Sequence, residues 1–274
     1  QRAEQHLRAL HGLGFTDQDY RWLTPPEVVR QVNAAGVEGA ISTPHVATLQ
    51  PLKLAYGLVG AAKGLGVRLY ENTPARITDG QLQTCSGLGI TARYTVLATE
   101  GYSTHSPLDR GILSVQSGMV CTEPLDEALW SRIGFTDRQA FCDFSRASTY
   151  LQRSADNRLV IGARGSYRFN NRAHHPLTAA GSDTRRRIGL AKALFPQLED
   201  IPFSHAWEGS LGVPRRFAPH VIFDDRNGLA TAGGYLGEGV GASFLFGQTL
   251  AEEITGCPSP RLAMPWVQRG RIAA

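Results

Sequence analysis

The stretch Ala232-Gly233-Gly234-Tyr235-Leu236-Gly237-Glu238-Gly239-Val240-Gly241-Ala242 decides the fold of this chain. It follows a short apolar run, 229–232, that predicts a strand, and it precedes 242–255, whose apolar spacing predicts a helix. Part of the stretch matches G-x-G-x-x-A. A dinucleotide fingerprint, however, opens a β-α-β unit with a second strand and an acid ~20 residues on. Only a helix and a loop are predicted after this stretch, so we reject the fingerprint interpretation.

The glycines support two other interpretations. A backbone without side chains can approach a flat ligand, and the N-terminus of a helix presents N–H donors and positive potential. Such a place suits an electron-rich ligand edge, for example a flavin pyrimidine carbonyl, as well as a phosphate. Tight packing between the strand and the helix would explain the same glycines, and the spacing alone does not choose between the two.

Segments before the glycine stretch have the pattern of layered α/β structure. Thr24 and Glu27 predict a capping box at the start of an early helix. Pro51 to Leu65 carries apolar residues at helical spacing, and 67–70 follows at once as a predicted strand. A helix that leads directly into a strand is typical of an α/β unit. A predicted hairpin then joins 81–84 to 90–99.

The middle of the chain is richer in predicted strands. Strands are expected at 112–120, 148–152 and 159–162, and Asp156-Asn157 is a hairpin turn signal. A helix is expected over 182–195, capped by Ser182 or Asp183. Because the β-rich and α/β segments alternate along the chain, any two domains must be interleaved.

Composition excludes several classes of protein. The chain has 274 residues, of which 42% are apolar and 19% charged, so it is neither disordered nor fibrous. No apolar run approaches the ~18 residues of a membrane span. The four cysteines form no C-x-x-C pair, which argues against a metal site and favours free thiols in a reducing, cytoplasmic compartment. The chain starts at Gln1 without a methionine, and we expect it to be a processed product or an N-terminally truncated fragment.

The excess of basic residues raises the question of nucleic-acid binding. Residues 145–187 hold nine arginines and two acids, and the net charge is +4. Aromatic residues do not interleave with these arginines as they do in single-strand binders. We favour a solvated face, with nucleic-acid binding as the weaker alternative.

Motifs for acid–base or nucleophilic catalysis are missing from the sequence. It contains no G-x-S-x-G, no H-E-x-x-H and no Walker loop. His45 is a candidate to face a site, although a structural histidine is the alternative. A sequence without its own catalytic constellation fits a protein whose cofactor carries the chemistry.

Several segments, taken in order, resemble one family. The chain resembles FAD-dependent oxidoreductases of the D-amino-acid oxidase and glycine oxidase superfamily, in particular the gamma-glutamylputrescine oxidoreductase-like branch. The resemblance extends over about 230 residues. It is carried by Thr43-Pro44-His45 with Pro51-Leu52-Lys53-Leu54, and by 66–73, 96–102, 152–159, 207–214 and 232–240.

The resemblance implies a fold and an activity. The fold would be α/β plus α+β, with a partial Rossmann-like FAD-binding domain (44–105 and 227–274) interleaved with a mixed or antiparallel-sheet substrate domain (1–43 and 106–226). The activity would be oxidation of the C–N bond of a small-molecule amine or amino acid. A hydride would pass to flavin N5, and the imine would then hydrolyse. The N-terminal ADP-binding β-α-β unit of such enzymes has no counterpart before Gln31.

The resemblance also assigns candidate residues. Ala75 would pass near the adenine. Tyr150 would line the amine pocket, and Arg153 or Arg164 would bind a carboxylate, unless either arginine forms a surface ion pair instead. The dinucleotide would run along Thr99, Glu100 and Gly101. The isoalloxazine would lie on Gly233, Gly234, Tyr235, Leu236, Gly237, Glu238, Gly239, Val240 and Gly241.

Three departures from the family pattern bear on substrate and activity. Pro214 to Pro219 keeps only the proline of a usual Thr-x-Asp-x-x-Pro motif, Glu208 replaces a usual glycine, and Gln50 replaces a common histidine. The alternative function is a non-catalytic subunit or binding module that needs a partner chain, carrying the ADP-binding half, to complete the FAD site.

Overall fold

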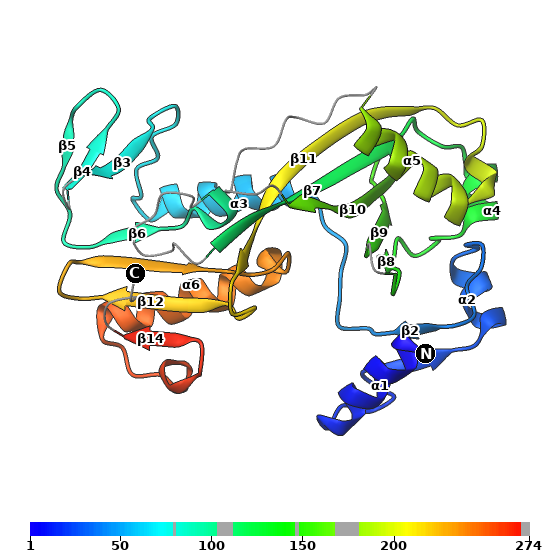
Figure 1. Cartoon of the computed structure of the whole chain (residues 1–274), viewed down its shortest axis with the longest axis horizontal. Coiled ribbons are helices and arrows are strands. Elements are labelled where there is room, and N and C mark those ends of the chain that lie inside the picture. Colours follow the sequence, from blue (N-terminus) through cyan, green and yellow to red (C-terminus); the bar gives the residue numbers. More distant parts are fainter. Residues whose placement is uncertain (79–80, 103–111, 146–147, 168–180, 270–274) are drawn as a thin grey trace. The chain divides into compact units, whose positions relative to one another are not determined.

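The computed structural model describes residues 1–78, 81–102, 112–145, 148–167 and 181–269 (Figure 1). They form two compact units. The first contains the described residues within Gln1–Gln50, Gln116–Ser166 and His174–Gly209. The second contains those within Pro51–Val115, Tyr167–Ala173 and Ser210–Ala274. In the described ranges, no helix is both long enough and apolar enough to cross a membrane.

The first unit is built on a five-stranded sheet with the strand order β11-β7-β10-β9-β8. The hairpin between β9 and β10 turns at Asn157, whose φ is 63°, so the predicted turn at Asp156-Asn157 is confirmed. The strands are β7 (Ile112–Thr122), β8 (Phe141–Cys142), β9 (Thr149–Arg153), β10 (Leu159–Tyr167) and β11 (Phe203–Pro214). The ends of β7 and β11 extend into the second unit.

An apolar core fills one side of this sheet. Burial alternates along β7, where the side chains of even-numbered residues from Ile112 to Val120 are buried and the odd-numbered ones are half-buried. This alternation is the period-2 pattern that predicted the strand. The helices α4 (Glu127–Ile133) and α5 (Ser182–Leu194) contribute to the core. Its fully buried side chains include Trp130, Ile133, Phe135, Leu159, Phe195 and Leu198.

The first fifty residues add α1 (Arg2–Gly12), β1 (Arg21–Leu23), α2 (Pro25–Gln31) and β2 (Ala40–Ser42), and β1 pairs antiparallel with β2. The N-terminus of α2 carries the capping box predicted from Thr24 and Glu27. The Thr24 N–H donates to Glu27 Oε2 over 2.8 Å, and the Thr24 bonds lower the pKa of Glu27 to about 2.

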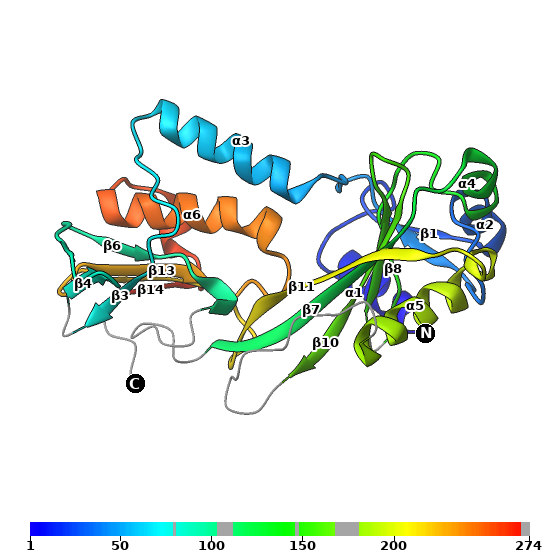
Figure 2. The ribbon, with the colours of Figure 1, turned by 90° about the horizontal axis from the view of Figure 1, so that it is seen from above.

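The second unit contains a four-stranded sheet with the order β14-β12-β13-β6. Here β13 is parallel to β6, β12 is parallel to β14, and β12 and β13 are antiparallel. Figure 2 shows α6 (Gly239–Thr255) running along this sheet. Phe246 and Leu250 of α6 are buried against Val221, Phe223 and Ala230 of the sheet. The strands are β6 (Thr95–Leu97), β12 (His220–Asp224), β13 (Leu229–Gly233) and β14 (Val267–Arg269).

The remaining elements of the second unit are α3 (Pro51–Gly64) and a small antiparallel sheet of β3 (Ala75–Thr78), β4 (Gln81–Thr84) and β5 (Gly89–Ile90). Two short 3₁₀ turns follow β6 and α6, at Glu100–Tyr102 and Pro260–Ala263. None of the α3 side chains is buried.

The structure corrects four predictions. Residues 67–70 are not a strand; Val67 and Tyr70 stay exposed, and no described strand pairs with this segment. The predicted strand 90–99 is divided into β5 and β6. The last helix begins at Gly239, three residues before the expected start. The N-cap of α5 is Gly181, not Ser182 or Asp183.

The predicted mixed α/β fold class is confirmed. The elements α4, β8, β11, β12 and β14 were not predicted from the sequence, because their residues become buried only when distant segments pack together. The domain boundary predicted at 105 falls within 103–111, outside the described residues.

Candidate functional site

The loop between β13 and α6 contains the glycine stretch that decides the fold. Gly234, Leu236 and Gly237 have φ values of 76°, 58° and 107°, so the chain reverses direction through three left-handed residues. Glycine takes this conformation without the steric cost that a side chain imposes. The loop delivers the chain to Gly239, the first residue of α6.

The N-terminus of α6 is open to a ligand. Its N-cap residue, Glu238, makes no side-chain capping hydrogen bond, and the first amides of any helix lack intrahelical acceptors. Gly237 and Gly241 are exposed, and a Cβ atom added at Gly241 would meet no atom within 4 Å. This part of the loop therefore offers N–H donors and bare backbone to an electron-rich, flat partner.

Glu100 ties the loop to the turn that follows β6. Its Oε1 accepts a hydrogen bond from the Tyr235 N–H over 2.8 Å. A Cβ at Gly212 would overlap the Glu100 carboxylate, and one at Gly101 would lie 2.5 Å from the Ser210 carbonyl oxygen. Glu100, predicted to line the dinucleotide, thus holds the backbone of the glycine loop, and Gly212 makes room for its carboxylate, while Gly101 lets the turn approach the backbone of Ser210.

The Tyr235 side chain anchors the start of α6. Its ring packs edge-on against Phe246, with centroids 5.5 Å apart. Burial, with a smaller contribution from the Glu100 charge, raises the pKa of Tyr235 to about 12, so the phenol stays neutral at physiological pH. The Tyr235 side chain therefore packs as a neutral, partly buried ring that connects the loop to α6.

Two other cofactor candidates lie outside this loop. Thr99 is exposed, directly before Glu100. Ala75 begins β3, opposite Thr84 in the small antiparallel sheet. Within the described residues, a hydrogen bond joins Glu100 to Tyr235 of the loop and Gly101 approaches the backbone of Ser210, and neither of these contacts involves Ala75.

In the first unit, Tyr150 lies on the face of the sheet opposite Leu151. Its hydroxyl is 2.6 Å from the Ser117 hydroxyl on β7. Tyr150 is paired with Gly162 on β10, and a Cβ at Gly162 would overlap the Tyr150 ring and the Met119 sulfur. The glycine therefore lets the ring lie flat across the sheet toward Ser117.

The other substrate candidates lie in different surroundings. Arg153 donates to Asn157 Oδ1, forms an ion pair with Glu127, and stacks over the Trp130 ring at 4.7 Å. These contacts occupy its guanidinium. Arg164 is on β10, but its side chain lies outside what the structure describes.

His45 forms a pair with Asp19 near the start of the chain. The His45 Nε2 is 2.9 Å from Asp19 Oδ1, and its ring meets Tyr20 edge-on. Hydrogen bonds from Thr16, and then the contact with His45, lower the pKa of Asp19. Both side chains of the pair are partly exposed. His45 therefore contacts a carboxylate of the first unit in this structure.

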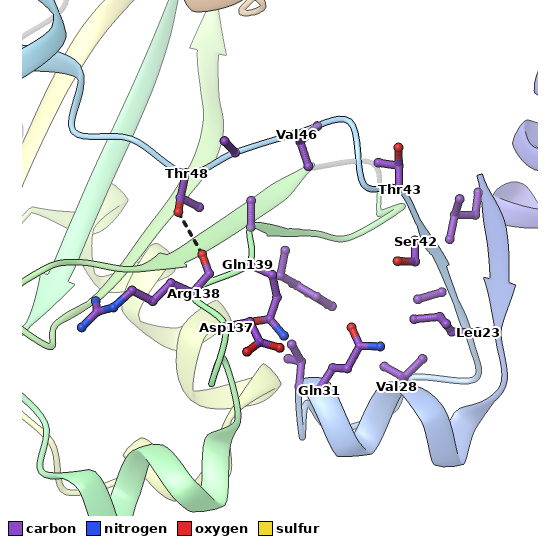
Figure 3. A pocket seen from close by; sticks show the side chains of 16 residues that line it. Leu23, Val28, Gln31, Ser42, Thr43, Val46, Thr48, Asp137, Arg138 and Gln139 are labelled. Atoms are coloured by element: carbon purple, nitrogen blue, oxygen red, sulfur yellow. Dashed lines mark hydrogen bonds between the residues drawn. The ribbon is translucent and has the colours of Figure 1, made fainter. Parts of the chain in front are cut away.

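A cavity of about 460 Å³ lies wholly within the first unit. It is lined by Leu23 of β1, by residues of α2 and β2, by Thr43, and by the segments 46–48 and 137–141. Figure 3 shows the Arg138 guanidinium pointing away from the cavity and the Thr48 hydroxyl donating to the Arg138 carbonyl over 2.9 Å. Neither Tyr150 nor His45 lines it.

Sequence reasoning missed Ser117, Gly118, Gly162 and Gly212. The apolar–polar alternation of 112–122 would have placed Ser117 and Gly118 on opposite faces of a strand. No local pattern indicates that Gly162 receives a ring or that Gly212 receives a carboxylate, because both partners are distant in sequence.

Most of the chain matches one family of known proteins. The family model described as DAO, FAD dependent oxidoreductase, matches residues 1–253. The chain is 29% identical over 249 residues to the probable oxidoreductase OrdL of Haemophilus influenzae, covering 82% of this chain and 52% of that protein. It is 27% identical over 267 residues to the OrdL of Rhizobium meliloti, covering 92% of this chain and 57% of that one.

Solved structures show the same fold. Glycine oxidase from Geobacillus kaustophilus superposes with a TM-score of 0.78 at 21% identity, over 98% of this chain and 71% of that one. L-proline dehydrogenase from P. horikoshii gives 0.72 at 18%, over 88% and 66%. At these identities the likeness shows the fold alone. The chain spans about half the length of the curated relatives it matches. Because the family model covers most of its length, the chain belongs to the DAO family of FAD-dependent oxidoreductases.

Proposed function

We propose that this chain is the flavin-ring and substrate-binding part of an FAD-dependent enzyme that oxidises the C–N bond of an amine or amino acid. The observation that carries the proposal is the open N-terminus of α6, held by the Glu100–Tyr235 bond, in a chain of the DAO family. The division into a substrate domain (1–43 and 106–226) and an FAD-binding domain is part of this proposal, as is the gamma-glutamylputrescine oxidoreductase-like branch.

The residues present fit a flavin ring. The bare backbone at Gly237 and Gly241 leaves room for a flat ligand, and the first amides of α6 would donate to its carbonyl edge. Positive potential at that helix end favours negative charge on the ligand. When bound, FAD supplies the two-electron acceptor for the hydride that leaves the substrate carbon.

The chain's own contribution to the reaction would be binding and orientation. Tyr150, held by Ser117 and Gly162, presents a hydroxyl on one face of the five-stranded sheet. A hydroxyl fixed in this way can bind a polar substrate group and hold the amine in one orientation. Fixing the reacting carbon relative to its acceptor is a large part of catalysis when the cofactor does the chemistry.

The pyrophosphate half of the FAD site would come from outside residues 1–274. The surface of α3 supports this proposal, because Leu52, Tyr56 and Leu58 are each more than half exposed and none of the α3 side chains is buried. Among the described strands, β6 lies at the edge of its sheet, parallel to its neighbour β13. Parallel strands are normally covered on both faces and extended by further α/β units.

Flavin binding tests the proposal directly. Coexpression of the chain with the rest of its reading frame, followed by gel filtration, should give a protein that retains the visible absorbance of oxidised flavin. Anaerobic addition of amines and amino acids should bleach it. A colourless protein that takes up no added FAD would overturn the flavoenzyme proposal.

A paired substitution tests the α6 N-terminus itself. Gly241→Ala should stabilise the helix by about 0.5–1 kcal/mol, yet weaken flavin binding, because the new methyl group occupies the open space beside the loop. Gly247→Ala, farther along the same helix and also without a near neighbour, is the control that should gain stability and keep flavin affinity.

The second candidate function is a non-catalytic subunit that completes its site with a partner chain. The exposed apolar surface of α3 favours it as much as it favours a missing segment. This candidate is excluded if the product of the whole reading frame, purified without any partner protein, holds a flavin whose absorbance is bleached by amines. Nucleic-acid binding has less support, because Arg153, Arg158 and Arg187 of the arginine-rich run are engaged inside the first unit.

A further inference from the structure

The cavity of the first unit has walls that are fixed by hydrogen bonds between distant segments. The Thr48 hydroxyl donates to the Arg138 carbonyl over 2.9 Å, which joins the segment after β2 to the segment before β8. The Phe135 N–H donates to the Gln31 carbonyl over 2.8 Å and holds the end of α2. The cavity is therefore formed before a ligand arrives, and its volume of about 460 Å³ suits a small molecule.

One wall of the cavity is apolar. Leu23, Val28 and Val32 line it, and each of these side chains is less than 5% exposed. Val32 belongs to the core of the first unit, and Phe141, which also lines the cavity, packs against that core. An apolar wall of this kind suits the hydrocarbon part of a ligand. The choice among ligands is left to the polar side chains.

Four polar side chains with free hydrogen-bonding groups line the rest of the cavity. Figure 3 shows the Gln31 carboxamide and the Ser42 hydroxyl directed into the cavity, with Asp137 and Gln139 on the wall formed by 137–141. Within the described residues, the side chains of Gln31, Ser42 and Asp137 make no hydrogen bond or ion pair. These side chains are available to a ligand.

The Gln139 side chain shows which kind of group is missing. Its Oε1 atom is buried and has no hydrogen-bond partner among the described residues. A buried polar atom without a partner needs an explanation, such as a ligand that completes the hydrogen bond. A carboxamide oxygen can only accept, so the absent partner is an N–H or O–H donor. The Ser42 hydroxyl and the Gln31 carboxamide oxygen can accept from the same donor group.

The charge of the cavity favours a cation. Asp137 and Arg138 are the charged residues among those that line it. The Arg138 guanidinium points away from the cavity (Figure 3) and donates to the Ser154 carbonyl and to Asn157 Oδ1. The Asp137 carboxylate is left as the charge that a ligand meets, and it attracts a positive group.

We propose that this cavity binds a small organic ammonium ion. The ammonium group donates to Gln139 Oε1 beside the Asp137 carboxylate, and its hydrocarbon chain lies on the apolar wall. The proposal goes beyond the proposed function, because neither Tyr150 nor the glycine loop lines the cavity. It is a second amine site, and an occupied site stabilises the folded chain as the amine concentration rises.

Amine binding by the chain itself is the first test, and it needs no flavin. Butylamine, which is protonated at neutral pH, is titrated into the ¹⁵N-labelled chain and should shift the amide signals of Ser42 and Gln139 in a saturable way. Butan-1-ol should bind at least about fivefold more weakly and butyrate should not bind. Ethylamine, two methylene groups shorter, should bind about tenfold more weakly than butylamine because it covers less of the apolar wall.

Substitutions separate binding from folding. Gln139→Met should weaken butylamine binding about fivefold or more, yet leave the stability of the free chain equal or higher, because a buried acceptor without a partner is removed. Asp137→Asn changes an exposed side chain, so the fold is kept, and it should weaken binding about threefold. Glu38→Gln, an exposed acid that does not line the cavity, is the matched control and should leave binding unchanged.

Three results would overturn the proposal. They are the absence of saturable butylamine binding to the wild-type chain, binding of butan-1-ol or butyrate as tight as that of butylamine, and equal butylamine affinity in the wild type and Asp137→Asn. If Gln139→Met fails to fold, Asp137→Asn and the ligand series decide. Saturable binding that depends on Asp137 in a chain that never retains flavin would support the amine site and leave the proposed function without support.

Discussion

Glu100 shows how one side chain sets the geometry of a loop. Its carboxylate reaches across 135 positions of sequence to the Tyr235 N–H. A buried backbone donor that loses its acceptor costs about 1–3 kcal/mol. The conformation of the loop 234–238 therefore depends on Glu100 as well as on the glycines.

Glu100→Ala should release the Tyr235 amide. We expect faster hydrogen exchange at Tyr235 and a loss of stability of about 1–3 kcal/mol, both measured on the purified chain. Glu238→Ala is the matched control, because Glu238 caps α6 without a side-chain hydrogen bond. An unchanged exchange rate at Tyr235 in Glu100→Ala would show that the glycine loop keeps its conformation without the hydrogen bond to Glu100.

Gly162→Ala should displace the Tyr150 ring, because the added methyl group overlaps it. Overpacking of this kind costs about 1–3 kcal/mol, and the bond between the Tyr150 and Ser117 hydroxyls should be lost. Thermal unfolding and the Tyr150 ring signals in NMR measure the two effects. Gly189→Ala on α5, where a Cβ meets no neighbour, should be neutral or stabilising; a neutral Gly162→Ala would contradict the packing described for Tyr150.

At the scale of elements, the N-terminus of α2 depends on pH. Glu27 has an ordinary pKa of 4.5 that falls to about 2 in the folded chain. A depressed carboxyl pKa contributes stability that is present above the unfolded value and is lost as pH falls through the folded value. The contribution of the capping box should therefore decline between pH 4.5 and about 2.

Hydrogen exchange at the Thr24 amide, which donates to the Glu27 carboxylate, measures this decline. Glu27→Gln should remove the pH dependence in that interval, and Glu38→Gln, which changes an exposed acid outside the box, should preserve it. Protection that stays constant from about pH 5 to about pH 2 in the wild type would contradict the role of Glu27.

At the scale of the whole molecule, the apolar surface of α3 predicts assembly with further α/β structure. Leu58 is 60% exposed on α3. Leu58→Lys should leave the stability of the chain within about 0.5 kcal/mol, yet reduce flavin retention when the chain is coexpressed with the rest of its reading frame. Leu13→Lys, in a loop of the first unit where the leucine is 78% exposed, is the control that should affect neither. Undiminished flavin retention in Leu58→Lys would show that α3 is not the assembly surface.

Local features of the fold were predictable from the sequence. The α2 capping box, the turn at Asp156-Asn157 and the order of strand, glycine loop and helix all follow from residues a few positions apart. The prediction of a strand at 67–70 was wrong because a strand needs a distant partner, and none of the described strands pairs with this segment. The sequence and the resemblance to one family both indicated the glycines of the candidate site, and their role in binding a cofactor stays a prediction.

What the sequence determined by itself is the fold class, the place of the glycine loop before the last helix, and the family. Hydrophobic periodicity and the conformational freedom of glycine act over short distances, so they can be read along the chain. Only the tertiary structure decided that Glu100 holds the loop, that Ser117 holds Tyr150 and that Thr48 binds Arg138 at the cavity. These partners are 135, 33 and 90 positions apart, and no local pattern specifies which distant residues packing will bring together.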